Sequence, residues 1–152
     1  MTEAAARRDT PVILLVEDNP ADVRLTQEVL RDTGALHRLL IARDGVQALE
    51  MVRRQGSNAD LPEPDIVLLD LNLPRKDGRE VLSEMKHDPA LKHIPVIVFS
   101  TSRAESDVVS CYNAHANCFV TKPVDLGEFT EFADLLTRFW LGHVQRAPKH
   151  AV

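Results

Sequence analysis

The sequence is poor in the residues on which disulfide-bonded and zinc-binding proteins depend. It has two cysteines in 152 residues, Cys111 and Cys118, and they do not form a Cys-x-x-Cys motif. Two isolated thiols argue against a disulfide scaffold and are typical of buried, reduced cysteines in a cytosolic protein. The six histidines are scattered without a pair at metal-ligand spacing, so we expect no zinc site.

Long apolar runs and excess positive charge are also missing. No stretch approaches the ~20 apolar residues of a membrane span, and no signal-peptide pattern opens the chain. The formal net charge is −5, which argues against non-specific nucleic-acid binding because that binding needs a basic surface. Hydrophobic residues make up 44% and charged residues 27%, an ordinary globular composition. We expect a cytoplasmic protein that binds neither membrane nor nucleic acid.

The sequence does contain a regular alternation of apolar runs and amphipathic segments. Continuous apolar runs bounded by turn residues indicate strands buried on both faces. Asn19 can cap one helix, and Asp44, Ser102 and Asp125 each precede a Glu or Gln by three residues, the pattern of a capping box. The expected strands are 11–16, 36–42, 65–70, 94–100 and 118–121, and the expected helices are 20–33, 44–55, 78–87, 102–114 and 125–140.

This alternation predicts one α/β domain over residues 11–146. Strands that alternate strictly with helices run parallel and are joined by right-handed crossovers, with helices on both faces of the sheet. We therefore expect a three-layer sandwich of five parallel strands and five helices, although the pattern alone does not give the strand order. The polar ends, 1–10 and 147–152, are expected to be a flexible arm and a loose tail.

Polar side chains stand where the predicted strands end. Glu17 and Asp18 follow the first strand, and Asp70 ends the third. Ser100 ends the fourth strand and Lys122 follows the fifth. Because the carboxyl ends of parallel strands share one rim, we expect these side chains to meet in one crevice. Each has an ordinary explanation on its own, as a turn, cap or surface residue, but their joint placement does not.

Three carboxylates in one crevice predict a bound divalent cation. They would repel one another without it, and oxygen ligands suit Mg²⁺, with Mn²⁺ as an alternative. The expected ligands are Glu17, Asp18 and Asp70, with a backbone carbonyl in the following turn, that of Asn72, as a further one.

A carboxylate beside a hard cation, a lysine and a hydroxyl matches the needs of phosphoryl transfer to an aspartate. Asp70 is the expected nucleophile and forms an acyl phosphate. Lys122 and the cation would neutralise charge on the phosphoryl oxygens, and Ser100 would donate a hydrogen bond to one of them. Asp70 needs no general base because a carboxyl group is already ionised at neutral pH.

The same residues resemble the receiver domain of two-component response regulators. The matching motifs are, in order, Glu17-Asp18, Asp70 with Pro74 and Gly78, Ser100, and Lys122-Pro123. The resemblance covers about residues 11–140. It implies a flavodoxin-like sheet of order 2-1-3-4-5, magnesium-dependent phosphorylation of Asp70 by a sensor histidine kinase, and often a cis peptide before Pro123.

The resemblance also assigns a switch. Phe119 occupies the aromatic switch position often filled by tyrosine, and Ser100 is the switch hydroxyl, where threonine is commoner. Thr101, Ser102 and Pro123 flank the site. Phosphorylation is expected to alter the face formed by the fourth helix, fifth strand and fifth helix.

A narrower resemblance concerns three stretches, 70–82, 115–123 and 139–141, which are similar to the stand-alone regulators paired with bacterial phytochromes. It implies a receiver without an output domain and a light-sensing histidine kinase as partner. The apolar stripe of the last helix is wide, because Leu135 and Leu141 extend it beyond one face. It belongs either to a core helix that is fully covered in a small domain or to a homodimer interface, and we favour the homodimer, as in the phytochrome-linked group. The candidate interface residues are Phe129, Phe132, Leu136, Phe139 and Trp140.

Other functions remain open at this point. A phosphorelay intermediate would use the same site and pass the group to a second histidine protein. A metal-dependent phosphatase would need a general acid or base near Asp70, and none is obvious at the rim. A phosphorylation-independent adaptor is weakened because no site residue is missing. We interpret the chain as a phosphoacceptor switch and not as an enzyme.

Overall fold

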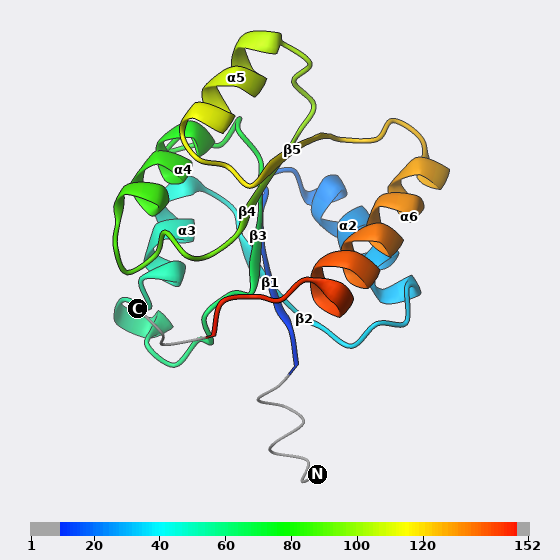
Figure 1. Ribbon diagram of the computed structural model, residues 1–152, viewed down its shortest axis with the longest axis horizontal. Coiled ribbons are helices and arrows are strands. Elements are labelled where there is room, and N and C mark those ends of the chain that lie inside the picture. Colours follow the sequence, from blue (N-terminus) through cyan, green and yellow to red (C-terminus); the bar gives the residue numbers. More distant parts are fainter. Residues whose placement is uncertain (1–9, 149–152) are drawn as a thin grey trace, which may run out of the picture.

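The computed structural model describes residues 10–148, so most of the expected N-terminal arm and residues 149–152 of the tail lie outside the described residues. Five parallel strands form one sheet in the order β2-β1-β3-β4-β5, as the family resemblance predicts (Figure 1). The strands are β1 (Val12–Val16), β2 (Arg38–Ala42), β3 (Ile66–Leu69), β4 (Val96–Ser100) and β5 (Cys118–Thr121).

Helices cover both faces of the sheet, which confirms the predicted three-layer sandwich. On one face, α3, α4 and α5 share a core with alternate strand residues, and α2 and α6 cover the other face (Figure 1). The α-helices are α2 (Pro20–Asp32), α3 (Gly45–Val52), α4 (Gly78–His87), α5 (Glu105–Asn113) and α6 (Leu126–Leu135). A short 3₁₀ helix, η1 (Gly56–Asn58), lies in the predicted loop, and η2 (Leu136–His143) continues α6.

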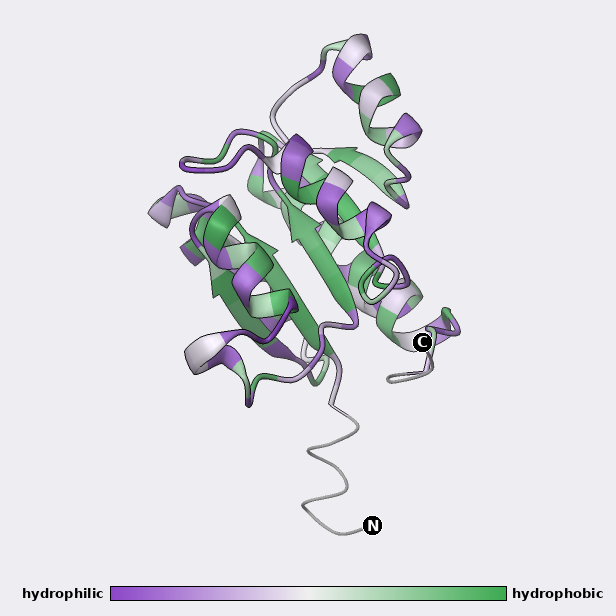
Figure 2. Cartoon of the chain, turned by 90° about the vertical axis from the view of Figure 1, so that its left-hand side faces the viewer, coloured by the Kyte–Doolittle hydropathy of each residue, from purple (hydrophilic) through white to green (hydrophobic). Residues whose placement is uncertain are grey.

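The apolar runs become strands because the sheet buries both of their faces. Every residue of β1, β3 and β4 is buried, whereas β2 and β5 at the sheet edges are mostly half-buried. Along β1, Leu14 and Val16 face one helical layer while Ile13 and Leu15 face the other. Figure 2 shows the hydrophobic strands between helices whose outer faces are hydrophilic.

Three of the four predicted caps form as expected. Asn19 Oδ1 accepts hydrogen bonds from the amides of Ala21 and Asp22, Asp44 accepts one from Gln47, and Asp125 accepts one from Glu128. The capping box at Ser102 is wrong. The residue that precedes α5 is Ala104, which makes no side-chain cap, because the Ser102 hydroxyl donates instead to Asp107 Oδ2 at 2.6 Å.

The last helix also departs from its prediction, which was one continuous α-helix. It is α-helical only to Leu135 and then continues as a π-helix through His143. At the change, the Thr137 hydroxyl donates to the carbonyls of Ala133 and Asp134, at 3.0 and 3.2 Å. A hydroxyl that occupies helix carbonyls in this way disturbs the ladder of backbone hydrogen bonds. In addition, α3 ends at Val52 and not near Gln55.

The segment after η2 returns beneath the sheet at the end opposite the polar rim (Figure 1). Arg146 donates to the carbonyls of Trp140 and Leu141 and lies 3.5 Å from Asp65 Oδ1. These contacts hold the chain as far as residue 146 against the sheet. Across residues 10–148, no helix is both long and apolar enough to cross a bilayer.

Candidate metal and phosphoacceptor site

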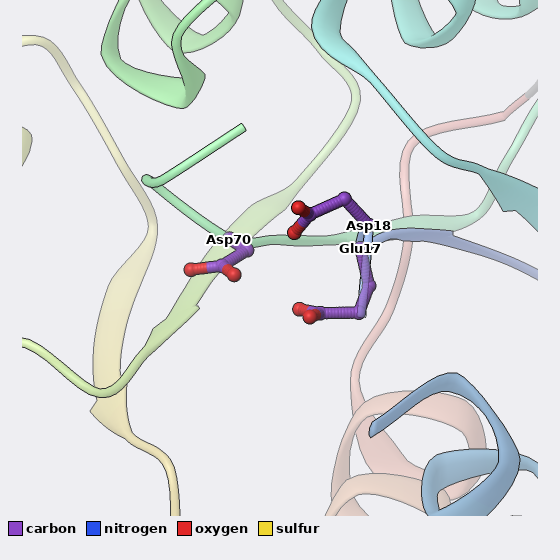
Figure 3. Close-up of side chains that lie close together, drawn as sticks. All are labelled: Glu17, Asp18 and Asp70. Atoms are coloured by element: carbon purple, nitrogen blue, oxygen red, sulfur yellow. The ribbon is translucent and has the colours of Figure 1, made fainter. Parts of the chain in front are cut away.

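Three carboxylates converge at the carboxyl ends of β1 and β3. Asp70 directly follows β3, and its amide donates to the Val16 carbonyl at 3.1 Å, so the ends of the two strands stay in register. Glu17 and Asp18 follow β1. One oxygen from each carboxylate lies within 4.8 Å of the others, and Figure 3 shows the side chains of Glu17 and Asp18 extending toward Asp70.

Glu17 is the electrostatically costly member of this group. Its side chain is buried, and that burial together with the neighbouring Asp70 raises the pKa of Glu17 from 4.5 to about 7. Asp70 is also buried, whereas Asp18 is exposed to solvent. A buried carboxylate that resists ionisation beside two others fits a divalent cation, which removes their mutual repulsion. Oxygen-only ligands suit Mg²⁺ or Mn²⁺.

A glycine lets the start of α4 lie close to the backbone of Asp70. The Gly78 amide donates to the Leu71 carbonyl at 2.8 Å, which closes the loop 71–77 before α4. A methyl group on Gly78 would overlap the Asp70 carbonyl oxygen, so only glycine lets α4 approach that backbone. Asn72 lies exposed in this loop, near the end of β3, and its carbonyl as a metal ligand stays a prediction.

Lys122 follows the edge strand β5, and its side chain reaches the carboxylates at the ends of β1 and β3. Its Nζ lies 2.7 Å from Glu17 Oε2, 3.4 Å from Asp70 Oδ2 and 3.2 Å from Asp22 Oδ2. Burial on its own would lower the pKa of Lys122, but the hydrogen bond to Glu17 and the charges of Asp70 and Asp22 raise it instead. The ammonium therefore stays charged at the site.

Asp22 is a site residue that the sequence reasoning missed. It had been interpreted only as an acidic residue in the first turn of α2, where it favours the helix dipole. The signal that it belongs to the site was its position in the first turn of the helix that begins directly after the acidic pair, which keeps a further carboxylate near the end of β1.

The switch candidates lie on the two neighbouring strands. Ser100 is fully buried at the end of β4, and its carbonyl accepts a hydrogen bond from the Lys122 amide at 2.9 Å. Its hydroxyl accepts one from the Ser102 amide at 3.3 Å, while Thr101 is exposed. Phe119 lies half-buried in β5, opposite Val98.

Two sets of polar contacts tie the ends of α5 to the neighbouring elements. At one end of the helix, Asp107 accepts from Ser102 and lies 2.8 Å from Arg79 Nη2 of α4. At the other end, the Tyr112 hydroxyl accepts from the Phe119 amide at 3.1 Å. Both ties end beside switch candidates, and sequence patterns gave no sign of them.

The peptide bond before Pro123 is not cis, contrary to the expectation drawn from the resemblance. Among the described residues no peptide bond is cis. The trans isomer is the one that an X–Pro bond prefers intrinsically, by about 0.5–1 kcal/mol. The trans chain already brings Lys122 to the carboxylates.

The candidate dimer residues divide into buried and accessible ones. Phe129 and Leu136 are buried in the core beneath α6, and Phe132 stacks on Phe99 with ring centroids 4.6 Å apart. Their place in the protein's own core makes Phe129 and Leu136 unable to form a direct contact with a second copy. Phe139 is 57% exposed, and Trp140 is half-buried beside it.

A parallel sheet of this order, with acidic residues, a hydroxyl and a lysine on one rim, defines a receiver domain. The chain belongs to the response regulator receiver domain family, whose model matches residues 13–134.

Its similarity to individual proteins points to one branch of that family. The chain is 49% identical over 130 residues to the response regulator Rcp1 of Synechocystis, covering 86% of this chain and 88% of Rcp1. Among solved structures, the phosphorylated cyanobacterial phytochrome response regulator RcpA superposes with a TM-score of 0.87 at 45% identity, over 91% of this chain and 99% of RcpA. The Mn²⁺-bound form of Rcp1 gives 0.85 at 47% identity over the same shares of the two chains.

Proposed function

We propose that this protein is a phosphorylation switch in which Asp70 accepts a phosphoryl group from the phosphohistidine of a sensor kinase. The observation that carries the proposal is that Asp70 lies beside both the acidic pair and the buried Lys122 ammonium. This arrangement supplies a nucleophile, a place for a cation and a fixed positive charge at one point. The matching family model and the similarity to phytochrome response regulators support the same role.

In the proposed reaction, an Asp70 carboxylate oxygen attacks the phosphorus in line. A P–O bond forms while the P–N bond of the phosphohistidine breaks, and its electron pair stays on the imidazole nitrogen. Lys122 and the Ser100 hydroxyl donate hydrogen bonds to the phosphoryl oxygens. Mg²⁺ held by Glu17, Asp18, Asp70 and the Asn72 carbonyl would supply charge neutralisation.

Substitution of the phosphoacceptor tests this proposal. Asp70→Asn should abolish labelling of the full chain by acetyl phosphate and Mg²⁺, whereas Asp60→Asn, an exposed aspartate of the loop after η1, should label normally. Labelling is measured as the mass increase of the intact protein, and circular dichroism checks that both variants fold. Unchanged labelling of Asp70→Asn would contradict the assignment.

We further propose that the kinase is of the phytochrome type, because the similar protein RcpA is a cyanobacterial phytochrome response regulator. Phosphotransfer from a panel of purified histidine kinases to the wild-type chain, with phytochrome kinases included, tests the partner. Fast transfer from a phytochrome kinase alone is the expected result. Equal transfer from unrelated kinases would contradict it. Rapid onward transfer from the phosphorylated chain to a histidine phosphotransfer protein would identify a phosphorelay intermediate instead.

Phosphorylation is proposed to act as a mark and not to begin a turnover cycle. Ser100 turns toward the phosphoryl group, Phe119 moves into the space released, and the α5–β5–α6 face changes. To convert a mostly inactive population into a mostly active one, the phosphoryl group must favour the active state by roughly 5 kcal/mol. Ser100→Ala should keep acetyl phosphate labelling but lose the accompanying change in amide exchange on α5. Steady turnover of a phosphoester would show an enzyme instead.

We place the switch in the cytoplasm, where the free thiols of Cys111 and Cys118 stay reduced.

A homodimer through the last helix completes the proposal. Leu135 and Phe139 leave 52% and 57% of their surfaces exposed, and a large exposed apolar patch often marks an interface. Phe139→Ser should convert a dimer to a monomer in sedimentation velocity at micromolar concentration. Val109→Ser serves as the control, since Val109 is 51% exposed on α5. A wild-type chain that is monomeric with and without phosphorylation would contradict the dimer, and dissociation by Val109→Ser alone would move the interface to α5.

A further inference from the structure

The Lys122 ammonium has one partner that is not part of the predicted metal group. An ammonium carries three N–H donors, and three carboxylates lie within reach of Nζ, those of Glu17, Asp22 and Asp70. The carboxylates whose oxygens cluster closely enough to share a cation are Glu17, Asp18 and Asp70. Asp22 lies outside that cluster among the described residues, yet it lies closer to Nζ than Asp70 does, at 3.2 against 3.4 Å.

The backbone of α2 fixes the position of Asp22. Its amide donates to the side chain of Asn19 at 3.2 Å, and its carbonyl accepts from the Thr26 hydroxyl at 2.8 Å. The first turn of a helix also favours a negative side chain. The Asp22 side chain is 37% exposed, while those of Glu17 and Asp70 are 3% and 10% exposed. The backbone of Asp22 is therefore held in place, and its side chain is exposed enough to lose its contact with the Lys122 ammonium without becoming a buried, unpaired carboxylate.

Binding of a cation or attachment of a phosphoryl group changes the surroundings of Glu17 and Asp70, the other two partners of Lys122, but not those of Asp22. With a cation bound, oxygens of Glu17 and Asp70 face the metal, and a phosphoryl group is carried by Asp70 itself. Asp22 takes part in neither change. Its carboxylate competes with the phosphoryl oxygens for the ammonium and also repels their negative charge. The two effects have the same sign, and both oppose the phosphorylated state.

We propose that Asp22 is a positioning residue that draws the Lys122 ammonium toward α2 and thereby weakens the hold of the site on a phosphoryl group. This inference rests on the proposed function and deepens it, because it names a residue that sets the balance between the resting and phosphorylated states. The same carboxylate has the opposite effect on the cation. It contributes negative charge near the metal group and shares the ammonium with Glu17 and Asp70, so that less of the ammonium's positive charge opposes a bound cation.

The test therefore looks for two effects of opposite sign in the full chain. Asp22→Asn should weaken binding of Mg²⁺ alone and should tighten binding of beryllofluoride, a phosphoryl mimic, measured at saturating Mg²⁺. Each dissociation constant, measured by isothermal titration calorimetry, is expected to change roughly two- to fivefold, the range of a partly exposed ion pair. A structural defect would weaken both ligands, so it cannot imitate this pattern.

Three further variants separate the contributions. Asp32→Asn removes the same charge from the exposed end of α2, about 15 Å farther along the helix, and should change neither constant. Asp22→Glu keeps the charge and should bind Mg²⁺ as the wild type does. In a Lys122→Ala background, Asp22→Asn should lose most of its effect on beryllofluoride, because the cation for which they compete is gone.

The outcomes distinguish this inference from the function on which it rests. Constants that move in the same direction, or an Asp22→Asn chain that binds both ligands as the wild type does, would overturn the role of Asp22 and leave the phosphorylation switch intact. A wild-type chain that binds no beryllofluoride in the presence of Mg²⁺ would overturn the proposed function, and the role of Asp22 with it.

Discussion

At the scale of single residues, Glu17 gives the site a pH dependence. Its pKa is about 7 in the folded protein, against 4.5 in the unfolded chain. The folded state therefore holds this proton more tightly, and the associated stability is present below pH 4.5 and lost as the pH rises through about 7. At ~1.4 kcal/mol per pKa unit, the loss is about 3 kcal/mol at most.

Chemical unfolding of the metal-free protein between pH 5 and 8 measures this loss. Glu17→Gln should flatten the dependence, and Glu50→Gln, an exposed glutamate on α3, should not. Because a cation competes with the proton for Glu17, Mg²⁺ should stabilise the wild type more at pH 8 than at pH 5.5. Equal stabilisation at both values would show that Glu17 is not a ligand.

Gly78 is the second residue whose environment dictates its identity. Its site has no room for a methyl group, since the obstacle is the backbone of Asp70 and Leu71 and not a flexible side chain. Gly78→Ala should lower the free energy of unfolding by about 1–3 kcal/mol, the usual cost of overpacking, and should slow labelling at Asp70. Gly142→Ala in η2, where a methyl group meets only an ordinary contact, should be neutral or slightly stabilising. Urea unfolding of both variants decides the point.

At the scale of elements, α5 is attached to the domain mainly by polar contacts. Cys111 is its one fully buried residue, whereas α3 and α4 bury several each. The Arg79–Asp107 pair and the Tyr112–Phe119 hydrogen bond hold its two ends. A helix with few buried apolar contacts opens at low cost in free energy. It is therefore suited to follow a change at the switch residues.

Removal of a tie should loosen α5 without unfolding the domain. In Arg79→Ala, hydrogen exchange of the α5 amides should be faster while that of β1 and β3 stays as in the wild type. Tyr112→Phe should produce the same effect at the other end of the helix. Arg103→Ala, an exposed arginine in the preceding loop, is the matched control. Wild-type exchange rates in both tie variants would mean that apolar packing alone holds α5.

At the scale of the whole molecule, the site joins strands from the centre of the sheet, so ligands should stabilise the entire fold. A ligand that binds only the folded state at 100 times its dissociation constant adds about 2.7 kcal/mol. Mg²⁺ with beryllofluoride should therefore raise the melting temperature beyond the effect of Mg²⁺ alone. Asp70→Asn should remove that additional increment, and differential scanning calorimetry measures it. If beryllofluoride still raised the melting temperature of Asp70→Asn beyond the effect of Mg²⁺, it would bind at a site other than Asp70.

Much of the architecture was predictable because burial leaves a simple trace in the residue order. A strand covered on both faces must be apolar throughout, as β1, β3 and β4 are. The order of the strands leaves no such trace, and it came from a family resemblance. The Ser102 cap failed because capping motifs are local patterns, and here the hydroxyl found a partner on α5.

For the site, residue order alone was enough to place Glu17, Asp18, Asp70, Ser100 and Lys122 on one rim, because parallel strands end on the same side of a sheet. The contact of Lys122 with Asp22 depends on how α2 lies against that rim, and the ties of α5 depend on which side chains meet between α5 and the neighbouring elements. The burial that keeps Phe129 and Leu136 from any partner likewise comes from packing on the sheet. Periodicity records whether a position is inside or outside, whereas distances between elements arise only when the layers are assembled.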